Sequence, residues 1–327
     1  MINQLAQFNK GELKMLLSVV FSFRNESLNL PTLLDRLERV LSGLPDLDYE
    51  IIFVNDLSSD NSMEILLDRR RNNPKIKIVN MSRRFGITPC VLAGFEASRG
   101  EAVIYMDADL QDPPELIPEL LAKYQSGVDV VHTVRTKRKG EAPAKIFVTI
   151  MAYRVINFFS NIELRENAGD FKLLSRRVVN EILRLSEYDP FMRGLSVWVG
   201  FPQDFVYYER DAKFSGKTQF PLFRSLNPGK ELLRGITSYS SMPLYFALIL
   251  GISVSFSAFC YLIYIVISRL FFDMHLPGWP AMMATMLFLG GVILFTIGVL
   301  GVYIGKIFDN VQGRPRYIIA DKIGFDE

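Results

Sequence analysis

The chain has 327 residues, of which 49% are hydrophobic, and its mean hydropathy of +0.18 is high for a water-soluble protein. Its formal net charge is only +2, from 37 Lys and Arg against 35 Asp and Glu residues, so no strong field is available to hold a long polyanion and nucleic acid is not an expected partner. The two cysteines, Cys90 and Cys260, lie in a mixed and an apolar region respectively, which argues against a structural disulfide or a zinc site.

The first part of the chain alternates between strand-like and helical patterns. Strand-like runs cover residues 16–23, 49–56, 75–80, 102–109 and 128–134, and helical patterns lie near 30–41, 62–71, 88–97 and 114–124. This alternation predicts an α/β domain with a mostly parallel, doubly wound sheet. In such sheets ligands bind beyond the carboxyl ends of the strands, so the polar residues that end each run are candidate site residues.

An apolar stretch of about 15 residues follows, between residues 144 and 160. It is too short to cross a bilayer, which needs roughly 20 residues. The basic run RTKRK just before it favours a helix lying in the plane of the lipid headgroups, and a buried core helix is the alternative.

Two long apolar blocks near the end of the chain, at about 243–268 and 281–305, are each long enough to span a bilayer. Lys and Arg residues flank the pair on its outer sides, whereas the connection between the blocks carries a single Arg. We therefore expect a two-helix transmembrane hairpin in the bacterial inner (plasma) membrane, with both flanks in the cytoplasm. The N-terminus lacks the apolar core of a signal peptide, which also keeps the first domain cytoplasmic. The expected organisation is a cytoplasmic domain at 1–225 followed by a juxtamembrane helix, the hairpin and a cytoplasmic tail at 226–327.

The most informative motif is DADLQDPPE, because its aspartates directly follow an apolar strand-like run. Asp107 and Asp109 stand two residues apart, and Gln111 adds a neutral oxygen. Hard oxygen ligands of this kind suit Mg²⁺ or Mn²⁺, which commonly bind substrate phosphates at the same time. The motif predicts a site for a metal ion and a nucleotide diphosphate, although a solvated turn often produces the same pattern.

Two further strand ends carry candidate nucleotide contacts. Asp56 in VNDLSSDNS is placed to accept hydrogen bonds from a base or ribose, since Ser58, Ser59 and Asp60 are better placed to cap the next helix. At the end of the first run, Phe23 offers a ring for stacking and Glu26 offers a polar contact, or both pack a loop.

Taken together, SVVFSFRNES, VNDLSSDNS, RRFG and DADLQDPPE resemble the inverting family 2 glycosyltransferases of the GT-A fold. The later order of RTKRKGE, AGDFKLLSRRVV and YIGKIFDNVQGRP is similar to the bacterial polyisoprenyl-phosphate glycosyltransferases, the group of bactoprenol glucosyltransferase and dolichol-phosphate-mannose synthase. The resemblance covers nearly the whole chain.

This resemblance implies transfer of a sugar from a nucleotide-sugar donor, with UDP-glucose or a related donor favoured, to a polyisoprenyl phosphate such as undecaprenyl phosphate. It implies that Asp56, Phe23 and Glu26 bind the nucleotide, that Asp107, Asp109 and Gln111 form the metal and diphosphate site, and that the enzyme is a homotetramer. Asp170 matches an acidic residue near the reacting sugar, as an acceptor-positioning group or a base.

Basic residues are needed to hold two phosphate groups near each other. Arg135 and Arg138 match family residues that contact the acceptor phosphate, and Lys213 and Lys217 are further candidates. After RDAKFSG many relatives have a Lys followed by an aromatic residue, whereas Gln219 precedes Phe220 here.

Two other functions share parts of this pattern. A processive polysaccharide synthase has the same catalytic domain but normally carries a Gln-x-x-Arg-Trp type motif and more helices, and neither is visible in the sequence. A catalytically silent membrane scaffold is the second, and the intact Asp107 and Asp109 argue against it.

Overall fold

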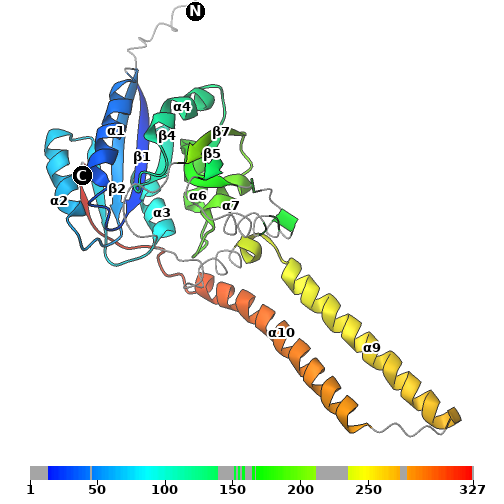
Figure 1. Ribbon diagram of the computed structural model, residues 1–327. Coiled ribbons are helices and arrows are strands. Elements are labelled where there is room, and N and C mark those ends of the chain that lie inside the picture. The colour runs from blue at the N-terminus through cyan, green and yellow to red at the C-terminus, as the bar shows by residue number, and fades with distance from the viewer. Residues whose placement is uncertain are drawn as a thin grey trace, which may run out of the picture. The chain divides into compact units, whose positions relative to one another are not determined.

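The computed structural model describes residues 14–44, 46–138, 151, 154, 157–158, 164–165, 167–210, 235–272 and 278–325 (Figure 1). Contacts within the chain divide it into two units. One comprises residues 1–154, 162–228 and 315–327, and the other comprises residues 155–161 and 229–314. The predicted headgroup-plane helix at 144–160 falls almost wholly outside the described residues.

Among the described residues, the first unit is built on an eight-stranded sheet in the order β7-β5-β6-β4-β1-β2-β3-β8. Its strands are β1 Met15–Phe23, β2 Leu47–Asn55, β3 Ile76–Met81, β4 Ala102–Asp107, β5 Val130–Arg138, β6 Ala168–Ser175, β7 Gln203–Arg210 and β8 Ile319–Ile323. Strands β3, β2, β1 and β4 run parallel, β6 is antiparallel to both β4 and β5, and β8 is antiparallel to β3. The predicted mostly parallel α/β sheet is confirmed.

The helices up to residue 125 follow the strands much as the hydrophobic pattern predicts, whereas the helices at 176–184 and 192–198 were not predicted. The described helices of this unit are α1 Leu30–Ser42, α2 Ser62–Asn72, α3 Ile87–Ala97, the 3₁₀ turn η1 Pro114–Leu116 with α4 Ile117–Gln125, α6 Arg176–Arg184 and α7 Met192–Trp198. In α1, Leu30, Leu33, Leu34, Leu37 and Leu41 are all buried, and their spacing of three and four residues puts them on one helical face. Each such leucine contributes about 1.5 to 3 kcal/mol through burial.

The two faces of the sheet bury different helices. On one face Leu17, Val19 and Phe21 of β1 join the apolar side chains of α1 and α4 in a continuous hydrophobic core. On the other face α3 lies so close to β1 that a Cβ atom added at Gly94 would stand 2.3 Å from Val20 Cγ1. Because side chains alternate along a strand, this second face also presents Ser22 of β1 and, at its carboxyl edge, the aspartates discussed below.

The end of the chain returns to the sheet as strand β8. Arg316 donates hydrogen bonds to the carbonyl oxygens of Leu183 and Leu185 at the end of α6, and the Tyr317 hydroxyl binds the Glu96 carboxylate. The residues after 314 therefore belong with the sheet, whereas the sequence groups them with the apolar helices as a tail. The difference has a simple cause: a five-residue edge strand with one isoleucine at each end has little periodicity to detect.

The second unit contains the helices α9 Met242–Phe272 and α10 Trp279–Val311, which contact each other. Both are long and apolar enough to cross a membrane, over Met242–Ile265 and Met282–Val311, and almost none of the apolar side chains in these windows is buried. Two polar contacts lie near their ends: the Tyr303 hydroxyl donates to the Ser240 carbonyl at 2.7 Å, and Lys306 Nζ donates to Ser238 Oγ at 2.9 Å.

Candidate active site

The sheet register brings a row of polar side chains together at the carboxyl ends of β1 and β4. Ser22 of β1 pairs with Asp107 of β4, and Tyr105 of β4 pairs with Lys172 of β6. Extending the second pairing by two residues places Asp107 opposite Asp170 on the same face. The Ser22 and Tyr105 hydroxyls lie 3.1 Å apart, and the Tyr105 hydroxyl donates to Asp107 Oδ1 at 2.8 Å.

Crowding of carboxylates disfavours the charged form of Asp107. Burial, followed by the negative charges of Asp170, Asp109 and Asp112, raises the pKa of Asp107 from 3.8 to about 7. The loop that carries Asp109 is a tight turn in which Leu110 has a φ of 61° and the Gln111 amide donates to Asp109 Oδ1 at 3.2 Å. A cation at this edge would relieve the repulsion between these oxygens, so the donor set fits a hard divalent metal.

The candidate metal ligands in the aspartate loop are Asp107 and Asp109. Within the described part of the chain, no group of three or more His, Cys, Asp and Glu side chains surrounds a single point. Mg²⁺ is typically held by one or two carboxylates while waters and substrate phosphates complete its shell, which is the arrangement that Asp107 and Asp109 allow.

Asp170 is held by an arginine that the sequence did not single out. Arg193, in the first turn of α7, donates from Nε to Asp170 Oδ1 at 2.8 Å and from Nη2 to Asp170 Oδ2 at 2.5 Å. Burial alone would raise the pKa of Asp170, but the positive charges of Arg193, Lys172 and Arg135 outweigh it and hold that pKa well below its usual range. A carboxylate in this environment is a fixed anion and a poor proton acceptor.

Arg135 contacts the underside of the aspartate loop. Arg135 is only 8% exposed, its Nε donates to the Tyr208 hydroxyl at 3.1 Å, and its Nη2 lies 3.6 Å from Asp112 Oδ1. The Tyr208 hydroxyl in turn donates to Asp112, which is fully buried. The structure thus gives Arg135 a supporting contact that the sequence did not predict. The other expected phosphate ligands are not placed: the Arg138 side chain, Lys213 and Lys217 lie outside the described residues.

Asp56 shapes a neighbouring loop. Its Oδ1 accepts the Phe85 amide at 2.7 Å and its Oδ2 accepts the Gly86 amide at 3.1 Å. Gly86 has a φ of 96°, a conformation that favours glycine, so this turn depends on the glycine of the RRFG motif. Asp56 is 7% exposed and lies at the carboxyl end of β2, where it holds the loop that follows β3.

Phe23 and Glu26 have local partners. The Phe23 ring is 4% exposed and packs edge-on against Phe53 in the core, so it fills the interior and does not present a face at the sheet edge. The Glu26 carboxylate accepts the Asn29 amide group at 2.5 Å, just before α1. The amides of Asn25, Glu26 and Ser27 donate to Ser58, Ser62 and Asp60, which binds the loops after β1 and β2 to each other.

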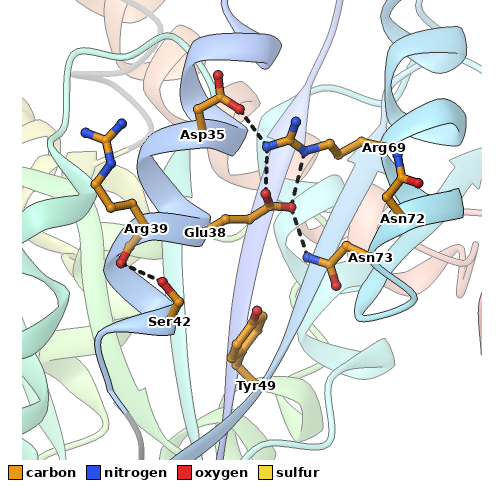
Figure 2. Close-up of a pocket in the computed structure, with 8 residues that line it drawn as sticks. All are labelled: Asp35, Glu38, Arg39, Ser42, Tyr49, Arg69, Asn72 and Asn73. Carbon is orange, nitrogen blue, oxygen red and sulfur yellow. Dashed lines mark hydrogen bonds and ion pairs between the residues drawn. The ribbon is translucent and has the colours of Figure 1, made fainter.

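Polar side chains line at least two hollows in the described surface. One lies between α1 and α2, near the amino end of β2, and Figure 2 shows its polar lining, in which Arg69 binds Asp35 and Glu38 and Asn73 binds Glu38. These groups satisfy one another, and the hollow is at the opposite edge from the aspartates. Another is a small cavity beside Asp170 that is lined by His132, Lys172 and Arg193, among others.

The residues that sequence reasoning missed are Arg193, Lys172, Tyr208 and Asp112. Lys172 follows Asp170 by two residues in a strand, so the alternation of side chains was a usable signal for it. Arg193 and Tyr208 carry no such signal, since they come from elements that are distant in the chain from Asp170 and Asp112.

A mixed, mostly parallel sheet with an aspartate loop at its carboxyl edge is the architecture expected of a glycosyltransferase domain of the GT-A type. The family model described as Glycosyl transferase family 2 matches residues 18–183, so the chain belongs to this family. An uncharacterized glycosyltransferase of Bacillus subtilis, YkcC, is 40% identical over 309 residues, which are 94% of each chain. The bactoprenol glucosyl transferase of Shigella phage SfX is 36% identical over 308 residues, 94% of this chain and all of that protein. Mannosyl-3-phosphoglycerate synthase of Rubrobacter xylanophilus, a solved structure, aligns with a TM-score of 0.49 at 18% identity over 69% of this chain and 74% of that chain.

Proposed function

We propose that this glycosyltransferase moves a sugar, with inversion, from a nucleotide diphosphate to a polyisoprenyl phosphate at the cytoplasmic face of a membrane. The observation that carries the proposal is the similarity to a bactoprenol glucosyl transferase over 94% of this chain and the full length of that protein. Because that relative is named for glucose, UDP-glucose is the favoured donor.

The aspartate loop is the proposed binding site of the donor diphosphate. Asp107 and Asp109 would hold Mg²⁺ or Mn²⁺, with Gln111 nearby. When bound, the ion supplies positive charge that stabilises the departing nucleotide diphosphate. Asp56 would act on the nucleotide both by its own oxygens and by holding the loop at Phe85 and Gly86.

The acceptor does not require a strong base. The second pKa of a phosphate monoester is near 6, so a lipid phosphate is largely a dianion at pH 7. Its oxygen forms a bond to the anomeric carbon while the bond from that carbon to the diphosphate oxygen breaks, and the electron pair leaves with the nucleotide. No proton needs to move, which is consistent with Asp170 being held as an anion.

The apolar helices α9 and α10 are proposed to span the bacterial plasma membrane as a hairpin, which would bring a lipid acceptor to the enzyme. Lys306, Arg314 and Arg316 follow the second apolar block, and the positive-inside rule places that flank in the cytoplasm. The homotetramer implied by the family resemblance stays a prediction.

The test is transfer of label into lipid. Membranes containing the protein are incubated with polyprenyl phosphate and a panel of labelled nucleotide sugars, and the organic phase is counted with and without EDTA. We expect one donor to label the lipid, with loss of label in EDTA and in Asp109→Asn. Asp204→Asn, at a surface carboxylate paired with Lys123, is the matched control and should keep activity.

Other outcomes would replace the proposal. Label that appears in a long polymer indicates a processive synthase. Metal-dependent nucleotide binding without transfer to lipid from any donor indicates a silent scaffold.

A further inference from the structure

Asp170 and Arg193 form a two-pronged ion pair at the edge of the candidate active site. The two hydrogen bonds, at 2.8 and 2.5 Å, use both carboxylate oxygens and two nitrogens of one guanidinium. The side chains are 27% and 36% exposed, so the pair is partly shielded from water. A fork of this kind fixes the plane of a carboxylate as well as its charge.

The helix that carries Arg193 is itself fixed to the sheet by polar contacts one turn further on. Lys172 Nζ, from β6, donates to Ser196 Oγ at 3.0 Å, and Ser196 Oγ donates to the Arg193 carbonyl at 3.1 Å. Arg193 and Ser196 stand three residues apart, so they share one face of α7. That face is the one that meets Asp170 and Lys172 of β6.

A second contact secures the end of the same helix. Gln203 Nε2, in β7, donates to the Val197 carbonyl at 3.1 Å, and the His132 ring nitrogen lies 2.8 Å from Gln203 Oε1. Lys172 and His132 are both buried, at 5% and 3% exposure. Buried polar contacts of this kind hold an element in one arrangement, since breaking them leaves desolvated groups without partners. These contacts therefore hold the helix that carries Arg193 against the sheet.

From this geometry we infer that Arg193 is a positioning residue, which acts by holding the Asp170 carboxylate as an oriented anion beside the reacting sugar. The inference rests on the proposed function and adds a residue and a role to it. The register of β4 and β6, extended by two residues beyond the Tyr105–Lys172 pair, places Asp170 opposite Asp107, at the edge where the donor sugar would sit. Positive charge develops on a sugar ring during glycosyl transfer, and a fixed anion stabilises it without accepting a proton.

The test is a double-mutant cycle on purified full-length protein in detergent. We expect Asp170→Asn to lower kcat about 30-fold and Arg193→Met to lower it about 10-fold, with the donor KM changed by less than about 2-fold. If Arg193 acts through Asp170, the double variant falls no further than about 30-fold. Arg193→Lys keeps the charge but not the fork and should recover part of the loss. A fall of about 300-fold in the double variant, the product of the two single losses, would overturn the inference.

Two controls separate this role from general damage. Arg184→Met, at an exposed arginine of α6 that pairs with Glu181, should leave kcat unchanged. The thermal midpoints of the wild-type protein, the two single variants and the double variant are also measured. The effects of the Asp170 and Arg193 substitutions on unfolding should be coupled, whether or not a donor is known. Coupling in unfolding with an inert wild-type enzyme would refute the proposed function alone, whereas absence of coupling in unfolding would refute the ion pair itself.

Discussion

The guanidinium of Arg135 lies under the aspartate loop, with its Nη2 atom 3.6 Å from Oδ1 of Asp112, and both side chains are buried. Removing one partner from such a pair leaves the other charge buried without compensation, at a cost of about 3 to 5 kcal/mol. We therefore expect Arg135→Met to lower the thermal midpoint sharply, measured by unfolding of the purified protein. An unchanged midpoint with a large rise in the KM for polyprenyl phosphate would instead show that Arg135 contacts the acceptor, as the family resemblance implies.

Asp56 is expected to affect binding of the nucleotide-sugar donor and not binding of the lipid acceptor. Asp56→Ala removes the carboxylate that accepts hydrogen bonds from the backbone amides of Phe85 and Gly86, so the loop after β3 is no longer fixed to β2 by these contacts. We expect nucleotide affinity to fall about 10-fold, which matches the loss of about 1.4 kcal/mol. Calorimetric titration with nucleotide measures this. Asp68→Ala, at an exposed aspartate of α2, is the control, and equal affinities for the two variants would contradict the assignment.

Metal binding is expected to depend on Asp107 and Asp109 together. Because Asp107 and Asp109 are the proposed protein ligands, Asp107→Asn and Asp109→Asn should each weaken Mn²⁺ binding by at least about 10-fold. Electron paramagnetic resonance of free Mn²⁺ measures this without any assay of transfer. Binding that survives both substitutions would place the metal elsewhere.

His132 should make the protein less stable as the pH falls. Burial and the neighbouring charge of Lys172 lower its pKa from 6.5 to about 4, although the contact with Gln203 opposes the shift. Between those values the unfolded chain binds more protons than the folded protein, so the free energy of unfolding rises with pH from about 4 to 6.5. The contribution is on the order of 3 kcal/mol. His132→Gln should flatten this part of a stability profile, and parallel profiles for the two proteins would contradict the prediction.

Deletion of residues 315–327 is expected to damage the sheet. The deletion removes β8 and exposes the edge of β3, together with the Arg316 contacts to α6. An unpaired edge strand promotes association between molecules. We expect a lower thermal midpoint and aggregation on size-exclusion chromatography. Lys322→Ser, at an exposed position of β8, should leave both unchanged.

Strands β1 to β5, helices α1 to α4 and the aspartate edge followed from the sequence because they depend on local periodicity and on the ends of apolar runs. Strands β6, β7 and β8 and helices α6 and α7 were not predicted. Asp107 is at the end of β4 as expected, and the two apolar helices occupy the predicted blocks. The fold class could therefore be predicted with the pattern alone.

Partners that come from distant elements were not predictable in the same way. Nothing near Asp170 in the chain points to Arg193, and the role of Arg135 depends on Asp112 and Tyr208, which meet only once β5, β7 and the aspartate loop are assembled. The surroundings of Phe23 were also not predictable from its position in the sequence. Its place at the end of a run indicates exposure at the edge, whereas the alternation of β1 turns the ring into the core.

The position of β8 has a consequence for synthesis of the protein. The strand that completes the sheet is encoded after α10, so a ribosome must release both long apolar helices before β3 can acquire its last neighbour. Until then the β3 edge of the nascent domain has no β8 to pair with, so the sheet can be completed only after both apolar helices have left the exit tunnel.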